Sequence, residues 1–186
     1  GHIKKNQLIQ AKKVNYNLQA LLGGSVKIAT QFQGGEFATF YLAPQDYHRV
    51  HIPYSGELKE MIYVPGRLFS VDDQTTKELP NLFVRNERVI TLFSTSIGPM
   101  AVILVGAMLV GSISITWEGV IVPALKRHIY HWHYLDNKIS LLKGQEIGQF
   151  QLGSTVIILF APNRMKWLTE LSGKKMKFGE CIGQTT

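Results

Sequence analysis

The chain has 186 residues, a length that favours one compact domain able to bury a substantial core. A single cysteine, Cys181, excludes an internal disulfide framework and a zinc site made of several cysteines. The 20 Lys and Arg residues against 13 Asp and Glu give a net charge of +7, which favours anionic partners such as nucleic acid, phosphate-bearing metabolites or an acidic membrane face.

The first predicted element is a short helix that starts at Asn15 or Asn17 and runs through Leu22. Asparagine caps helix starts well, because its side chain accepts a hydrogen bond from the first turn. The pair Gly23-Gly24 is suited to end the helix in a left-handed turn.

Most of the remaining chain indicates short strands separated by turns. β-Branched and aromatic residues favour extended backbone, and glycine and proline mark the turns. The predicted strands are Phe37 to Leu42, Leu58 to Val64, Val89 to Phe93, Val110 to Ile115 and Thr155 to Phe160. With no internal repeat and no linker, the sequence predicts one β-rich α+β domain over residues 1–186, with mainly antiparallel strands and few helices.

The most apolar stretch, Met100 to Ile115, does not meet the requirement for a membrane-spanning helix. Glycines and serines interrupt it, and it is shorter than the ~20 apolar residues needed to cross a bilayer. The first residues also lack the apolar region of a secretory signal. Because the sequence does not begin with Met, we expect the native start of the protein to lie upstream of Gly1.

Two histidines three residues apart, His48 and His51, follow the first predicted strand in the segment Asp46-Tyr47-His48-Arg49-Val50-His51-Ile52-Pro53. Imidazole is the usual side chain for proton transfer near neutral pH. From these residues alone, a polar loop whose histidines only form hydrogen bonds is the simpler interpretation.

A Gly-Ser pair, Gly153-Ser154, stands at the start of the predicted strand Thr155 to Phe160. Glycine permits unusual backbone angles and close approach, so the Ser154 hydroxyl could attack the Gly153 carbonyl. An ordinary turn into a strand is again the simpler interpretation, and the Gly-x-Ser-x-Gly nucleophile elbow of hydrolases does not occur in the sequence.

Three further histidines, His128, His131 and His133, lie close together in the second half of the chain. In a strand, His131 and His133 would share one face and could chelate a metal. Asp136 is the one carboxylate that follows nearby, and the interleaved apolar and aromatic residues fit a half-buried strand edge. We therefore assign no metal ligand.

The basic residues are dispersed, and their densest group lies near the C-terminus: Arg164, Lys166, Lys174, Lys175 and Lys177. They follow neither an RNP-like nor a helix-turn-helix pattern, so we expect no nucleic-acid partner. A solvated or membrane-facing surface fits better, since anionic lipid attracts each nearby basic residue by about 1 kcal/mol.

Taken together and in this order, the motifs resemble the phosphatidylserine decarboxylase family. The family places a histidine pair early in the chain and a self-cleaving Gly-Ser pair late, so two motifs that are weak separately become specific together. The resemblance covers nearly the whole chain and rests on these segments: Gln10 to Lys12, Tyr16 to Leu22, Phe40 to Gly56, Tyr63 to Val71, Asn86 to Val89, Gly98 to Ala101, Val105 to Ala107, Val110 to Ile113, Lys143 to Gly148 and Leu152 to Thr155.

The resemblance implies a self-processing zymogen, a pyruvoyl-dependent carboxy-lyase of phospholipid biosynthesis. Ser154 would attack the Gly153 carbonyl, and elimination would leave a large β subunit, residues 1–153, and a small α subunit, residues 154–186. The new terminus would become a covalent pyruvoyl cofactor derived from Ser154. This group would form a Schiff base with phosphatidylserine and release CO2 to give phosphatidylethanolamine.

The same resemblance implies roles for single residues. His51 would be the base that activates Ser154, and His48 would assist decarboxylation or protonation. Arg49 is a weaker candidate for steering an anionic group. The family's third processing residue, an aspartate, and its membrane-binding N-terminal helices fall upstream of the segment that matches Gly1, and we put no other aspartate in that place.

The resemblance also implies a homodimer that acts as a peripheral membrane protein on the cytoplasmic face of a bacterial inner membrane, with an anionic lipid surface as partner. Two alternatives stay open. An uncleaved, inactive lipid-binding relative predicts an intact chain. A metal-dependent enzyme built on His128, His131 and His133 predicts stoichiometric metal.

Overall fold

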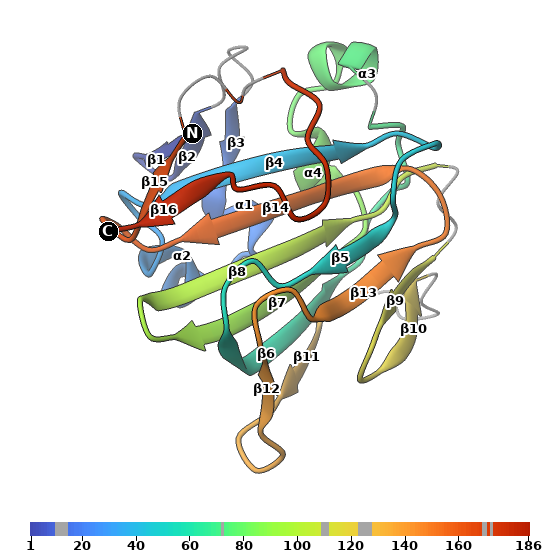
Figure 1. Cartoon of the computed structure of the whole chain (residues 1–186). Helices are drawn as coiled ribbons and strands as arrows, with labels where there is room; N and C mark the ends of the chain where they lie inside the picture. Colours follow the sequence, from blue (N-terminus) through green and yellow to red (C-terminus); the bar gives the residue numbers. More distant parts are fainter. Residues whose placement is uncertain (10–14, 72, 109–111, 123–127, 169–170, 172) are drawn as a thin grey trace.

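Strands dominate the fold of the chain, and its helices are short (Figure 1). The structure is a computed structural model that describes residues 1–9, 15–71, 73–108, 112–122, 128–168, 171 and 173–186. The strand pairs described run antiparallel, and an isolated bridge between Arg67 and Asn86 is parallel. The predicted β-rich α+β fold with mainly antiparallel strands is confirmed.

The largest sheet has ten strands, and Ser154 of the Gly-Ser motif is the first residue of one of its central strands. In spatial order its main path runs through β11 (Tyr130–His133), β6 (Gly56–Val64), β7 (Arg88–Thr95), β8 (Gly98–Val105), β14 (Ser154–Phe160), β4 (Glu36–Leu42), β1 (His2–Lys4), β2 (Gln7–Ile9) and β3 (Asn15–Asn17), and β12 (Ile139–Leu141) also pairs with β6. Every residue of β14 is buried. Burial of each of its large apolar side chains stabilises the fold by roughly 1.5–3 kcal/mol, so this strand is fixed firmly in place.

A smaller, four-stranded sheet carries His51, the second of the early histidines. Its order is β10 (Gly119–Val122), β9 (Ile113–Ile115), β13 (Glu146–Phe150) and β5 (Arg49–His51). Figure 1 shows β5 and β13 in front of the large sheet, and apolar residues of both sheets belong to one buried cluster. A two-stranded sheet of β15 (Met165–Trp167) and β16 (Gly183–Thr185) completes the described strands.

The helices are α1 (Leu18–Leu21), α2 (Val26–Thr30), α3 (Asp73–Glu78) and α4 (Leu82–Arg85). The predicted cap at Asn17 is confirmed, because its side chain accepts a hydrogen bond of 2.8 Å from the Ala20 N–H. Gly23 and Gly24 follow with φ of 73° and 90°, as a left-handed helix end requires. A helix start at Asn15 is wrong, since residues 15–17 pair with β2 as strand β3.

Arg88 is a fully buried cation that ties the helices to the large sheet. Its guanidinium donates hydrogen bonds to the carbonyls of Leu21, Ala20, Val84 and Asn86 at 2.7–2.9 Å. Burial lowers the pKa of Arg88 to about 10, so the side chain is still charged near neutral pH. The four carbonyls therefore replace the water that this charge loses on folding.

Four of the five predicted strands are confirmed, each lying within a slightly longer observed strand: β4, β6, β7 and β14. The fifth is observed as β9 over Ile113–Ile115, while Val110 and Gly111 lie outside the described residues, as do Gln10 to Lys12 of the family resemblance. Strand β8 was not predicted as a separate element. This strand pairs with β7 on one side and with β14 on the other. No helix in the described part of the chain is long and apolar enough to cross a membrane.

Candidate functional site

Ser154 is the first residue of β14 and is completely buried. Its backbone pairs with Leu42 at the end of β4. Its hydroxyl oxygen has no hydrogen-bond partner among the described residues. Leaving a buried hydroxyl unpaired costs about 1–3 kcal/mol, and the hydroxyls of Thr155 and Tyr16 are buried without a described partner as well.

Gly153 packs against the end of β4 more tightly than most side chains allow. A Cβ atom at this position would lie 3.1 Å from the Leu42 carbonyl oxygen and 3.3 Å from the Pro44 nitrogen. Both neighbours are backbone atoms, one in the last residue of β4 and one in the turn that follows it. Glycine therefore holds the peptide between residues 153 and 154 directly against the chain that follows β4.

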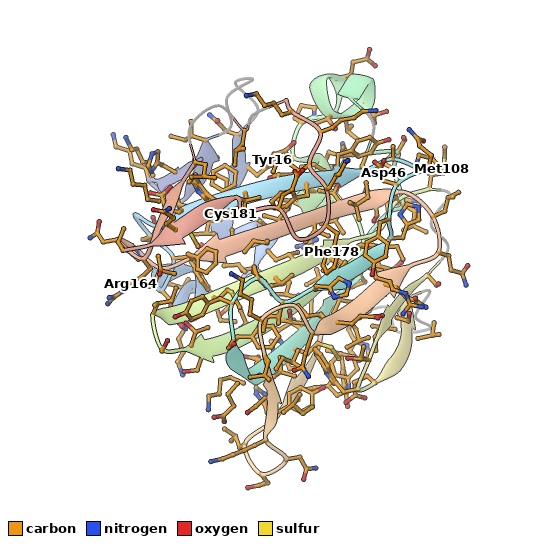
Figure 2. All side chains as sticks on the ribbon, in the orientation of Figure 1. Tyr16, Asp46, Met108, Arg164, Phe178 and Cys181 are labelled. Atoms are coloured by element: carbon orange, nitrogen blue, oxygen red, sulfur yellow. The ribbon has the colours of Figure 1, made fainter. Side chains whose placement is uncertain are left out.

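A small cavity of about 70 Å³ lies beside Gly153. Its lining comes from segments that are distant in the sequence, including Tyr41, Pro44, Ser70, Ala107 and Met108. Figure 2 shows Asp46 and Met108 on the same side of the molecule, where β4 ends and β14 begins. The Gly-Ser peptide thus borders a recess into which a small polar group fits.

His48 lies on the segment between β4 and β5, and both His48 and Gly153 are neighbours of Pro44. Its Nε2–H donates to the Pro44 carbonyl at 3.0 Å, and the Pro44 ring is one of the groups that a Cβ at Gly153 would meet, at 3.3 Å. With the proton on Nε2, Nδ1 of the neutral ring is an acceptor. This Nδ1 is buried and has no partner in the described part of the chain.

His51, the last residue of β5, is held on both sides. Its Nδ1–H donates to the Gly144 carbonyl at 2.8 Å, which leaves Nε2 as the acceptor of a 2.8 Å hydrogen bond from the Tyr47 hydroxyl. The ring also packs against Phe178, with centroids 4.3 Å apart. Figure 2 shows Phe178 on the C-terminal segment, which runs across the front of the sheets to this point. The one lone pair that His51 offers as a base is therefore occupied by Tyr47.

The structure does not bring all residues of the predicted site into contact with one another. Neither histidine forms a hydrogen bond to the Ser154 hydroxyl, which has no partner among the described residues. Arg49, the candidate for steering an anion, instead forms a 2.7 Å ion pair with Glu146 on β13. The hydrogen bond and charge of Glu146 raise the pKa of Arg49, although the pair is exposed.

The later histidines form a separate group on β11. His131 and His133 share one face of the strand as predicted, and His128 is not part of the group. The sequence analysis missed Glu60 on β6, whose Oε1 lies 2.6 Å from His131 Nδ1 and 4.0 Å from His133 Nδ1. Only the pairing of β11 with β6 reveals this neighbour, so no sequence pattern could have found it.

Comparison with known proteins adds a family to this geometry. A family model described as phosphatidylserine decarboxylase matches residues 1–184. The chain is 50% identical over 186 residues to a phosphatidylserine decarboxylase proenzyme of Nitrosococcus oceani, covering 99% of this chain and 61% of that protein. It is 52% identical over 189 residues to the proenzyme of Yersinia pestis strain Pestoides F, covering 99% of this chain and 64% of that protein. The chain thus spans somewhat less than two thirds of the length of these relatives.

Proposed function

Because the chain belongs to the phosphatidylserine decarboxylase family, we propose that it cleaves itself between Gly153 and Ser154 and converts phosphatidylserine into phosphatidylethanolamine and CO2. The observation that carries this proposal is the buried Ser154 hydroxyl, which has no partner among the described residues and directly follows the tightly packed Gly153.

The proposed cleavage uses only atoms of the chain and water. The Ser154 hydroxyl attacks the Gly153 carbonyl carbon, an ester bond forms, and the amide bond to the Ser154 nitrogen breaks. Loss of the Ser154 α-proton then breaks the bond between Cβ and Oγ, which releases Gly153 as a carboxylate and leaves dehydroalanine at position 154. Hydrolysis of this terminus releases ammonia and leaves a pyruvoyl group on residues 154–186.

The surroundings of Ser154 fit such a group. The side chain is already buried, its oxygen has no described partner to lose, and the adjoining cavity of about 70 Å³ gives a small carbonyl group access to a recess. A pyruvoyl carbonyl supplies the electron sink that no ordinary side chain offers when an α-amino acid loses CO2. The cavity is too small for acyl chains, so we propose that only the serine headgroup enters it.

We assign His51 as the base that takes the Ser154 proton and His48 as the residue that assists decarboxylation or protonation. A base must come within hydrogen-bond reach of the proton that it removes. His51 can do so only after the Tyr47 hydroxyl releases Nε2. His48 already has an unpartnered acceptor, Nδ1, in the described structure, and it lies on the segment that covers Gly153.

The proposed substrate is a membrane lipid, and the C-terminal segment has the character of a surface that meets anionic lipid. The exposed aromatic Phe178 follows Lys177 in the sequence. All five basic residues of the C-terminal group are exposed: Arg164, Lys166, Lys174, Lys175 and Lys177. We propose that the protein works at an anionic membrane surface. The homodimer and the cytoplasmic face of a bacterial inner membrane remain predictions.

Ser154→Ala tests the proposal. We expect this variant to lose both chain cleavage and decarboxylation of phosphatidylserine in detergent micelles, because no hydroxyl remains to form the ester. The matched control is Thr155→Val, since Thr155 is equally buried but its side chain points to the opposite face of β14. We expect this control to be cleaved. Decarboxylation that persists in Ser154→Ala would overturn the proposal.

A further inference from the structure

Two imidazoles and a carboxylate meet on the outer strands of the large sheet, away from Ser154. Strand β11 lies beside β6, at the opposite end of the sheet's main path from β3 (Figure 1). The register places His133 directly opposite Glu60, and His131 is the next residue on the same face. Neighbouring strands hold the three backbones, so the cluster is built into the sheet rather than into a loop.

The distances within the cluster suit a single small cation. The possible ligand atoms of Glu60, His131 and His133 all lie within 4.8 Å of one another. A tetrahedral zinc ion at about 2.0–2.2 Å from each ligand requires them to be roughly 3.4 Å apart. The contact between His131 and Glu60 is 2.6 Å and that between His133 and Glu60 is 4.0 Å. Small rotations of exposed side chains bring both to that separation.

The surroundings keep these side chains accessible. The exposed fractions of the His131 and His133 side chains are 42% and 61%, and that of Glu60 is 19%. On the other face of β11, Trp132 packs against the core and Tyr130 contacts it edge-on at 4.5 Å. The aromatic pair holds the strand so that both imidazoles point outward, where an ion from solvent can reach them.

A simple ion pair does not require a second imidazole, as another site in the protein illustrates. His2 and Glu36 form the same 2.6 Å contact between Nδ1 and a carboxylate oxygen, without a second histidine. Among the described residues, the group of Glu60, His131 and His133 is the one place where three such side chains gather. Two imidazoles with one carboxylate form a typical zinc ligand set that leaves positions open.

We propose that Glu60, His131 and His133 bind one divalent transition-metal ion of the zinc class, with its remaining positions open to water. The ion would fasten the outer strand β11 to β6 through side chains, in addition to the backbone pairing. This site is distinct from the Gly153-Ser154 site and takes no part in the proposed cleavage.

Calorimetric titration with zinc chloride tests the site on the full chain, without a histidine tag and in a Cys181→Ser background. The background removes the exposed thiol, which is itself a zinc ligand. We expect one ion per chain. Glu60→Gln and His131→Ala should each weaken binding by about tenfold or more, since even the loss of an outer-shell partner costs a metal site that much.

Two controls separate this cluster from zinc binding by histidine in general. His128→Ala removes a neighbouring histidine outside the cluster, and His2→Ala removes the imidazole of the simple ion pair. Both should bind zinc as the parent does. The thermal unfolding midpoint should rise with zinc in the parent but not in Glu60→Gln, because an ion that binds only the folded state stabilises it.

Circular dichroism without metal first checks that each variant is folded, and Glu60→Gln preserves the size of the side chain if His131→Ala fails this check. Absence of zinc binding in the parent, or unchanged binding in Glu60→Gln, would overturn the proposal and leave the cluster as a network of hydrogen bonds. Loss of binding in Glu60→Gln together with retention in His128→Ala would support it.

Discussion

Ser154 and His51 act together in the proposed cleavage, as nucleophile and base, but their surroundings in the protein are opposite. Ser154 opens the central strand of the large sheet, is fully buried, and has a hydroxyl without a partner among the described residues. His51 ends a strand of the smaller sheet, is half-buried, and has both ring nitrogens in hydrogen bonds of 2.8 Å.

This difference indicates which of the two limits the reaction. A nucleophile without a partner breaks no hydrogen bond when it reacts, whereas a base whose lone pair is occupied has to lose one first. We therefore expect the release and placement of His51, rather than the placement of Ser154, to set the rate of cleavage. The predictions below test this contrast.

Removal of the two imidazoles should give the largest effects after that of Ser154→Ala. We expect His51→Ala to slow cleavage by about 100-fold or more, the usual contribution of a general base. His48→Ala should leave cleavage largely intact and suppress turnover of phosphatidylserine. Appearance of the small chain during cell-free synthesis measures the first effect, and CO2 release measures the second. Equal behaviour of the two variants would show that the division of roles is wrong.

Gly153→Ala should have the next largest effect. The added methyl group would meet the Leu42 carbonyl oxygen at 3.1 Å, so the peptide at residue 153 has to shift by a few tenths of an ångström. Misplacement of reacting atoms is costly, and we expect cleavage to slow by about tenfold. The matched control is Gly119→Ala on β10, at a position where an added methyl group meets no atom within 4 Å, although its φ of 76° also disfavours alanine. If Gly153→Ala is cleaved at the parent rate, close packing at Gly153 has no part in the reaction.

Tyr47→Phe tests the occupied lone pair directly. The substitution removes the hydroxyl that holds His51 Nε2 and keeps the ring that packs against it. A hydrogen bond with a net value of about 1 kcal/mol corresponds to about a fivefold faster cleavage once it is gone. The control is Tyr54→Phe, which removes a hydroxyl bonded to Ser96 instead. Slower cleavage in Tyr47→Phe would mean that this hydroxyl orients the base rather than restrains it.

Tyr16→Phe should have the smallest effect and tests whether an unpaired buried hydroxyl by itself signals function. The Tyr16 hydroxyl, like that of Ser154, is buried without a partner in the described part of the chain. We expect the variant to be cleaved normally and to be as stable as the parent, or more stable by up to about 1 kcal/mol near pH 7. Impaired cleavage would mean that Tyr16 is part of the site.

The stability difference between the parent and Tyr16→Phe should depend on pH, because burial raises the pKa of Tyr16 in the parent from 10.0 to about 12. Between these values the folded state binds more protons than the unfolded state, so the free energy of unfolding falls as pH rises above 10. Burial also raises the pKa of Tyr63 and Tyr134, while that of Arg88 is lowered and acts in the opposite direction. The difference in free energy of unfolding between parent and variant reports on Tyr16 alone. This difference should be constant below pH 10 and should change in favour of the variant above pH 10.

Much of the fold could be predicted because local chemistry determines it. Asn17 and the pair Gly23-Gly24 fix the ends of α1, and β-branched runs fix β4, β6 and β14. Strand β8 was harder to predict. It is buried between two neighbouring strands, so its residues form a continuous apolar run instead of alternating apolar and polar side chains. Such a run does not distinguish a strand from a helix.

The candidate site could be predicted only in part. Gly153, Ser154, His48 and His51 follow from motifs and their order, but their hydrogen bonds depend on partners such as Gly144 that are distant in the sequence. Glu60 could not be found at all, because its proximity to His131 arises from strand register. Sequence patterns identify the chemical groups, and the fold decides which of them meet.

Intact mass spectrometry of the denatured protein tests self-cleavage at Ser154 most directly, because it needs neither substrate nor a variant. We predict two chains, residues 1–153 and 154–186, the smaller one with a pyruvoyl group in place of its N-terminal amine. Hydroxylamine should add to that smaller chain alone, since it reacts with the ketone. A single intact chain of 186 residues that does not react with hydroxylamine would contradict the account.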